Sequence, residues 1–265
     1  KRIKHQIDIV ELLKGCIDNQ VVVVEVLTSP TLEKNATGKV SSIIGNYMDE
    51  GVEVDSALHR HQIPSTFGDK ALEETTKLPT KVLAKDKKKR ADITILELVT
   101  IDGEDSRDFD DAVYAIPSSN GWKLIVAIAD VSHYVKEGSM LDTESLERGN
   151  SVYFPHRVVP MLPEAISNGL CSLNPKVERL CMVCEMEIDS IGSLLEYKFY
   201  PAVMLSHARL TYVEVNEMLE NKKSKLRKKY KNIETNIDFL YGLYQILRIS
   251  RQKRGVMDFD RIESQ

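Results

Sequence analysis

Apolar stretches alternate with short polar turns through the first quarter of the chain. Residues 21–27 are almost all valine or leucine, valines recur at 38–40 and 52–54, and polar or glycine-bearing turns separate them. Short β-rich segments divided by turn residues are typical of a small barrel or sandwich. We predict such a domain over residues 1–67, and expect its beginning to be missing because the chain starts without a turn or cap.

A polar, charged segment follows and ends in the basic run 85–90. Its composition is typical of a connector between domains, which we assign to residues 68–91. The basic run can contact phosphate. A solvated linker is the simpler interpretation, because no aromatic residue is interleaved to stack on a base.

The pattern beyond the connector predicts strands. Apolar residues dominate 93–101, and the segments 112–116 and 122–129 flank Asn120-Gly121, which accepts positive φ angles and predicts a β-hairpin. Asp110, Asp111 and Asp130 would then lie at one end of this hairpin. Further strands are expected at 179–188 and 195–205, joined around Gly192.

The last third of the chain is predicted to be helical. Between residues 231 and 254 apolar side chains recur with helical period, and Gly255 is a plausible cap; these apolar positions are Ile233, Ile237, Leu240, Tyr244 and Leu247. Lysine and arginine crowd residues 222–229 between two helices, where a solvated surface explains them at least as well as RNA binding. The predicted fold class is α+β.

Composition narrows the class of protein. The 265 residues suffice for one large domain or two ordinary ones, and 42% of them are apolar. The net charge of −4 lacks the basic excess of a nucleic-acid coat, so any RNA contact must be local. No apolar run approaches the roughly 20 residues that span a bilayer, and no signal-like stretch opens the chain, so we expect no membrane contact and a cytoplasmic location.

Four cysteines are too few for a disulfide framework in a chain of this size. Only Cys181 and Cys184 have the spacing of metal ligands, and they sit in an apolar stretch without the tight turn that a zinc knuckle needs. Residues three apart on a strand face opposite sides. Buried structural cysteines are therefore favoured over a zinc site.

An acidic loop is the candidate for chemistry. Residues 102–111 contain six carboxylates, directly after one predicted strand and before another. Such crowding is repulsive unless a cation compensates it, and oxygen ligands without histidine or cysteine indicate a hard ion, Mg²⁺ or Mn²⁺. An EF-hand is excluded, because its glycine and glutamate positions carry Arg107 and Val113.

An acidic, solvent-exposed turn is the alternative, and for an arbitrary aspartate cluster it would be preferred. Here Phe109 sits among the aspartates and strands flank the loop on both sides. Rigid strand ends are where a scaffold presents catalytic groups. Two metal ions held about 4 Å apart by such carboxylates can activate water for phosphodiester hydrolysis.

Seven sequence segments carry a family resemblance. The run 100–113 closely resembles the aspartate signature of the RNB catalytic domain of the ribonuclease II and ribonuclease R family. Segments 167–170 and 206–212 are typical of the ribonuclease R branch. The other segments that resemble the family are 126–135, 148–155, 158–164 and 170–175. The resemblance extends from about residue 95 to 259.

The resemblance implies a cold-shock-like OB domain followed by the N-terminal part of a mixed α/β RNB domain at residues 92–265. It implies a monomeric exoribonuclease that processively degrades single-stranded RNA from the 3′ end to nucleoside 5′-monophosphates with two metal ions. Mg²⁺ is the expected cofactor, with Mn²⁺ as the alternative. Cold-shock folds bind single strands with aromatic groups. The only Phe, Tyr or Trp residues among the first 67 are Tyr47 and Phe67, so this part would guide RNA electrostatically or support the catalytic domain.

Four aspartates match the family's acidic positions. By the resemblance, Asp102, Asp108 and Asp111 would chiefly bind the metals, and Asp110 would help hold the hydroxyl of the terminal nucleotide. Tyr153 matches the tyrosine that stacks on the terminal base; without its motif, a packed tyrosine would be the preferred interpretation. Base stacking is worth about 1–3 kcal/mol and tolerates any sequence.

Phe259 resembles the partner aromatic of Tyr153, whereas Glu104 and Asp105 match no catalytic role. Family members continue past residue 265 with an arginine and a glutamate that complete the active site, so this chain alone is expected to be inactive. A non-catalytic RNA-binding or scaffold module is the alternative. The four aspartates argue against it, because a scaffold has no physical reason to keep their repulsion.

Overall fold

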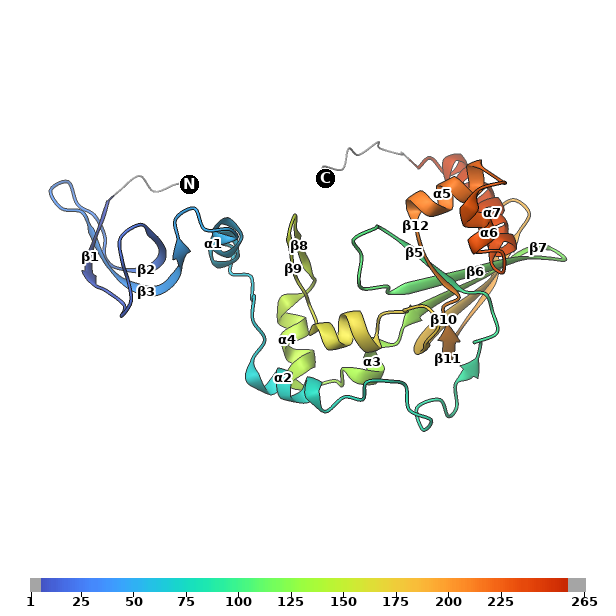
Figure 1. The fold of residues 1–265 in the computed structure, drawn as a ribbon, viewed down its shortest axis with the longest axis horizontal. Helices are drawn as coiled ribbons and strands as arrows, with labels where there is room; N and C mark the ends of the chain where they lie inside the picture. The colour runs from blue at the N-terminus through green and yellow to red at the C-terminus, as the bar shows by residue number, and fades with distance from the viewer. Residues whose placement is uncertain (1–5, 257–265) are drawn as a thin grey trace. The chain divides into compact units, whose positions relative to one another are not determined.

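The computed structural model describes residues 6–256 and divides the chain into two compact units, Lys1–Thr66 and Phe67–Gln265 (Figure 1). The first unit contains a three-stranded sheet in the order β1-β3-β2, from β1 (Ile7–Glu11), β2 (Gln20–Thr28) and β3 (Ala36–Asn46). The predicted strands at 21–27 and 38–40 are confirmed. The sheet is OB-like, as expected.

The strand predicted at 52–54 is wrong, because these residues begin helix α1 (Val52–Arg60). Val52 and Leu58 are the buried residues of this helix. Gly51, with φ of 89°, precedes it in a conformation that suits glycine, and acidic residues occupy the first turn while basic residues occupy the last. A three-residue valine pattern is too short to separate a strand from one face of a helix.

A seven-stranded sheet in the order β12-β5-β6-β7-β10-β11-β4 forms the centre of the second unit. Strands β8 (Val152–Phe154) and β9 (Arg157–Val159) form a separate hairpin. The strands of the large sheet are β4 (Ala91–Asp92), β5 (Val99–Asp102), β6 (Asp111–Ser118), β7 (Gly121–Ala129), β10 (Glu178–Asp189), β11 (Leu194–Leu205) and β12 (Ala208–Thr211).

The predicted β6–β7 hairpin is confirmed, with Ser118 opposite Gly121 at the turn and Asp111 opposite Ile128 at the other end. Gly121 has φ of 147°, and a Cβ there would lie 2.3 Å from the carbonyl oxygen of Ile188 on β10. Only glycine allows β10 to approach this turn. The paired strands β10 and β11 around Gly192 are confirmed as well.

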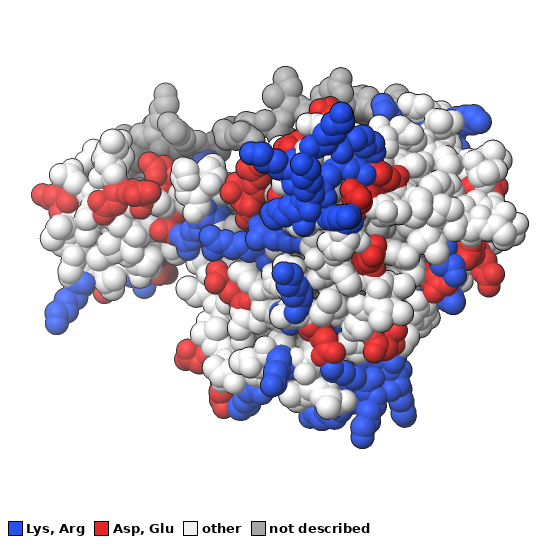
Figure 2. Space-filling model, turned by 45° about the vertical axis from the view of Figure 1, so that its right-hand side comes forward, with Lys and Arg blue, Asp and Glu red and all other residues white. Residues whose placement is uncertain are grey.

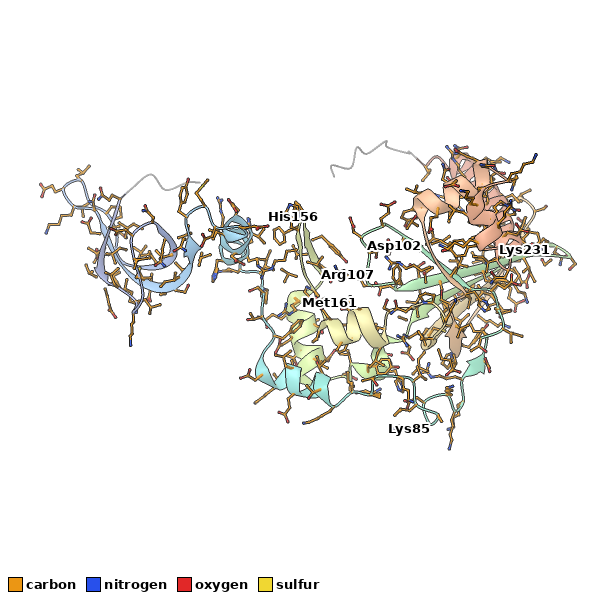
Figure 3. All side chains as sticks on the ribbon, in the orientation of Figure 1. Lys85, Asp102, Arg107, His156, Met161 and Lys231 are labelled. Atoms are coloured by element: carbon orange, nitrogen blue, oxygen red, sulfur yellow. The ribbon has the colours of Figure 1, made fainter. Side chains whose placement is uncertain are left out.

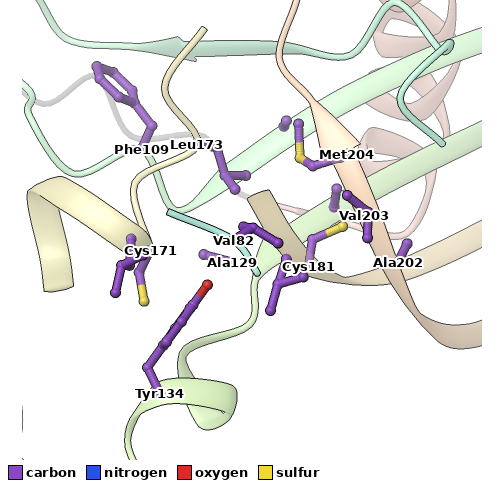
Figure 4. Packing of buried hydrophobic residues seen from close by; sticks show 14 of the residues in the cluster. Val82, Phe109, Ala129, Tyr134, Cys171, Leu173, Cys181, Ala202, Val203 and Met204 are labelled. Atoms are coloured by element: carbon purple, nitrogen blue, oxygen red, sulfur yellow. The ribbon is translucent and has the colours of Figure 1, made fainter. Parts of the chain in front are cut away.

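Helices cover both faces of the sheet (Figure 1). On one face, α5 (Tyr212–Glu220), α6 (Lys225–Lys229) and α7 (Glu234–Lys253) bury Met218, Ile237 and Leu243 against it. On the other, the core joins sheet residues to α2 (Asp69–Thr76), α3 (Val131–Tyr134), α4 (Met140–Arg148) and the π-helix η1 (Ala165–Leu170). Figure 4 shows this core, including Phe109, Tyr134 and Cys171. The predicted helix near the C-terminus is α7, although Tyr244 is 53% exposed.

The segment expected to be a solvated connector, 68–91, is instead folded onto the second unit. Ala71 of α2 is fully buried, and the α2 carboxylate Glu74 accepts hydrogen bonds from the first turn of α4. Lys87 forms an ion pair with Glu178. The remaining lysines of the run 85–89 stay exposed, and Figure 3 labels Lys85 among them. Figure 2 shows lysine and arginine side chains of one face in blue. Long-range packing, which composition does not report, orders this segment.

Two further sequence expectations are refined. The strand expected over 93–101 begins only at Val99, and residues before it form turns with Ile93 and Leu98 buried. Cys181 is buried in the core and Cys184 is half-buried on the same strand, so the two thiols face opposite sides of β10. Within residues 6–256, no helix is both long and apolar enough to cross a membrane.

Candidate active site

The acidic loop connects β5 to β6 in the second unit and is anchored by its one aromatic residue. Phe109 is only 2% exposed, and its backbone is bonded at both ends: its N–H donates to Ser172 Oγ (3.1 Å), and its carbonyl accepts from the Leu173 N–H (2.8 Å). The Ala129 N–H donates to the Asp110 carbonyl (2.9 Å). Burying Phe109 therefore turns the neighbouring aspartates outward from a fixed backbone.

Three of the four predicted acidic residues line one pocket of about 730 Å³. Asp102, Asp108 and Asp110 contribute to its wall together with Tyr153, whereas Asp111 does not. The β8–β9 hairpin forms the opposite side, and Figure 3 shows Asp102 and Arg107 on the loop across from His156 at the hairpin tip. The structure therefore brings Asp102, Asp108, Asp110 and Tyr153 to one pocket and leaves Asp111 outside its lining.

The carboxylates repel one another. Partial burial, together with repulsion from three neighbouring aspartates, raises the pKa of the Asp110 carboxyl above its ordinary value. Partial burial and repulsion from Asp102 likewise raise the pKa of Asp111. Burial is the largest cause of both shifts, and the repulsion that adds to it is what a bound cation would relieve.

The carboxylates of Asp102 and Asp108 already accept hydrogen bonds from the protein. Asp102 accepts from the Gly103 N–H (2.7 Å) and from the Ser106 hydroxyl (2.8 Å), and Asp108 accepts from the Tyr153 hydroxyl (3.0 Å). Partial burial and the hydrogen bond to Asp108 raise the pKa of Tyr153 to about 12, so its phenol stays protonated. The ring itself is 64% exposed and can be reached by a base.

The candidate ligands in the loop are carboxylate oxygens, which hard divalent ions prefer. Their negative charges repel one another, so a bound cation would stabilise them. Between residues 6 and 256, however, no three His, Cys, Asp or Glu side chains are grouped closely enough to hold a metal ion. The fit is therefore one of charge and donor type. Asp102, Asp108 and Asp111 would have to draw together around a bound cation.

Asp130, expected at the same end of the hairpin, is committed to a different task. It is 6% exposed and bonds to Arg90 at 2.5 Å and to the Ser132 hydroxyl at 2.8 Å. Burial opposes its ionisation, but these hydrogen bonds outweigh burial and lower the pKa of Asp130. This ion pair ties the end of segment 68–91 to the sheet and leaves Asp130 outside the pocket.

Sequence reasoning gave no role to several residues at the site. Asp105, Ser167 and Asn168 line the pocket, the last two from the π-helix η1, a helix type frequent at functional sites. Ser172 and Arg209 contact the acidic loop from behind. The signal that could have identified Ser167, Asn168, Ser172 and Arg209 was their position inside segments that carry the family resemblance. Phe259 lies outside the described residues.

The second unit is an α+β domain whose acidic loop and β8–β9 hairpin line one pocket. The RNB domain family matches residues 90–265 and the cold shock domain family matches residues 1–68, so the chain belongs to the RNB family.

Relatives place the similarity within one branch of this family. The chain is 48% identical over 265 residues to ribonuclease R of Vibrio cholerae, covering 99% of this chain and 32% of that protein. It is 49% identical over 245 residues to ribonuclease R of Escherichia coli, covering 92% and 30%. The chain therefore spans about a third of the length of these curated relatives.

A solved structure supports the same similarity. RNase R of Mycoplasma genitalium, in complex with double-stranded RNA, matches with a TM-score of 0.87 and 31% identity over 96% of this chain and 45% of that one. The α+β fold class expected from the sequence is confirmed by this match.

Proposed function

We propose that the protein carrying this chain is a cytoplasmic exoribonuclease that binds single-stranded RNA and hydrolyses it processively from the 3′ end, releasing nucleoside 5′-monophosphates. The observation that carries the proposal is the shared pocket of Asp102, Asp108 and Asp110 with the exposed ring of Tyr153. Carboxylates that repel one another beside a stacking platform combine a cation site with a base site.

The roles of the aspartates are assigned by the family resemblance. Asp102, Asp108 and Asp111 would hold Mg²⁺ or Mn²⁺, and Asp110 would position the hydroxyl of the terminal nucleotide. Two bound ions would activate water and stabilise charge on the leaving oxygen. Asp110 is suited to bind a hydroxyl, because its backbone is fixed by Ala129 and its side chain lines the pocket.

Tyr153 supports the last base. Its exposed ring offers a stacking surface, and its hydroxyl fixes the ring by donating to Asp108. Arg107, His156 and Arg157 line the same pocket and place basic groups where a phosphate backbone would enter. The pocket thus joins basic groups for the strand with acidic groups for the metals.

The relatives support an RNA substrate. They are named ribonuclease R, and solved M. genitalium RNase R structures contain double-stranded or ribose-methylated single-stranded RNA. We extend RNA binding to this chain because it shares the fold of those structures and because its pocket is lined by residues from the segments that resemble the family.

The test is shortening of 5′-labelled single-stranded RNA with Mg²⁺, by the full-length protein and its Asp110→Asn variant. We expect the parent to shorten RNA stepwise and the variant to bind RNA while cutting it at least about 100-fold more slowly. Asp105→Asn, in the same pocket but with no assigned role, is the matched control and should retain activity.

A parent protein that binds RNA but releases no nucleotide with Mg²⁺ or Mn²⁺ would contradict the proposal. That result would favour the alternative, a non-catalytic RNA-binding module.

A further inference from the structure

Arg209, on the strand next to β5, forms hydrogen bonds with the backbone of the acidic loop. Its strand β12 pairs in parallel with β5, with Thr211 opposite Asp102, so the ladder fixes where its side chain starts. From there Arg209 Nη2 donates to the carbonyls of Glu104 (3.3 Å) and Ser106 (2.9 Å). Its Cζ lies 4.5 Å from the centroid of the Phe109 ring, in a cation–π contact.

Ser172 forms hydrogen bonds with the second half of the loop, at Arg107 and Phe109. It is fully buried, and its hydroxyl donates to the Arg107 carbonyl (3.0 Å) while accepting from the Phe109 N–H (3.1 Å). These two bonds bracket Asp108. Arg179 Nε in turn donates to the Ser172 carbonyl (2.8 Å), so the residue that holds the loop is itself held.

Both contacts act on backbone and leave the aspartate oxygens available. Among the described residues Arg209 forms no ion pair with a carboxylate, although it places a positive charge beside the loop. An arginine paired directly with an aspartate would occupy oxygens that a cation needs. Hydrogen bonds to the loop carbonyls instead hold the backbone in place without occupying the carboxylate oxygens.

We propose that Arg209 and Ser172 are positioning residues, which hold the backbone of the acidic loop so that its aspartates can bind the catalytic cation. The proposal rests on the proposed function of the pocket. Residues that orient metal ligands typically change metal affinity 10–100-fold when replaced.

The test measures Mn²⁺ binding directly, by electron paramagnetic resonance of the full-length protein and its variants Arg209→Gln and Ser172→Ala. Arg209 is exposed, so its variants are expected to fold. We expect both substitutions to weaken Mn²⁺ binding about 10-fold or more. RNA affinity in EDTA should stay within about twofold of the parent, because phosphate and base contacts are unchanged.

Two matched controls separate positioning from general destabilisation. Ser224→Ala removes a buried serine hydroxyl that caps α6, and Arg248→Gln removes an exposed arginine on α7. Both should bind Mn²⁺ like the parent. Arg209→Lys keeps the charge but cannot bridge two carbonyls as well, so its Mn²⁺ affinity should fall between those of the parent and Arg209→Gln.

Equal Mn²⁺ affinity in the parent and in folded Arg209→Gln would overturn the proposal while leaving the exonuclease assignment intact. A parent protein that binds no Mn²⁺ and degrades RNA no faster than its Asp110→Asn variant would instead overturn the proposed function. The two failures are therefore distinguishable.

Discussion

Asp110 and Asp111 are neighbours in the chain but lie in different surroundings. Asp111 begins β6 and pairs with Ile128, whereas Asp110 precedes the strand and lines the pocket. Consecutive residues at the start of a strand point in different directions, which accounts for Asp110, and not Asp111, lining the pocket beside Asp108. Their raised pKa values mean that burial of the charged carboxylates, together with their repulsion, destabilises the folded state above those pKa values, and that a bound proton relieves this cost.

At the same scale, Tyr153→Phe and Tyr153→Ala separate the two tasks of this tyrosine. Tyr153→Ala removes the stacking surface, worth about 1–3 kcal/mol, and should lengthen the final RNA product. Tyr153→Phe loses only the bond to Asp108 and should leave product length unchanged. Gel analysis of end products measures this, with Tyr197→Ala, an exposed tyrosine of β11, as control. An unchanged product from Tyr153→Ala would refute the stacking role.

At the scale of elements, hairpins and helix contacts hold the site in place. The β6–β7 hairpin fixes Asp110 through Ala129, and β12 carries Arg209 to the loop and then leads into α5. A capping box begins α5, where Thr211 and Glu214 bond each other's backbone N–H groups. Arg227 of α6, 8% exposed, joins α5 to α7 through the Met218 carbonyl and Asp238.

The Arg227–Asp238 pair predicts a pH-dependent stability. Hydrogen bonding from Arg227 is the main cause that lowers the pKa of Asp238 to about 2. A lowered carboxyl pKa stabilises the fold above the unfolded value near 4, and this contribution is lost as the pH falls toward 2. Asp238→Asn should therefore lower Tm at pH 7 by about 2–4 °C.

Thermal unfolding between pH 7 and pH 3 checks this, because the difference in Tm between parent and variant should shrink below pH 4. Glu73→Gln removes one partner of an exposed ion pair with Lys77 and should leave Tm unchanged. A difference as large at pH 3 as at pH 7 would show that Asp238 stabilises the helices through something other than its charge.

At the scale of the whole molecule, the chain divides between Thr66 and Phe67 into two compact units. Each has its own sheet, and segment 68–91 belongs to the second unit through Ala71 and the Arg90–Asp130 pair. Residues 61–67 carry no helix or strand. A boundary between two compact units that carries no helix or strand is a preferred site of proteolysis.

Limited digestion with a nonspecific protease should therefore cut first within residues 61–67, not within 68–91. Mass spectrometry of the early fragments identifies the cut, and circular dichroism of the larger fragment should show a cooperative melt. Early cleavage among the lysines at 85–89 would show that this basic segment is a solvated linker after all.

The sequence by itself determined the local elements that have strong periodicity or special turns. The β6–β7 hairpin follows from Asn120-Gly121, strands β10 and β11 from long apolar runs around Gly192, and α7 from its helical period. The acidic loop also followed from local order, because Asp102 ends one strand and Asp111 begins another.

Only the tertiary structure decided how these parts meet. Burial of Val52 and Leu58 made a helix of a valine pattern that suggested a strand, and packing on α4 ordered a segment whose composition suggested a linker. Ser172 lies 63 residues from Phe109, and Arg209 lies 103 residues from Ser106. Contacts across such separations depend on strand order and long-range burial, which local residue patterns do not encode.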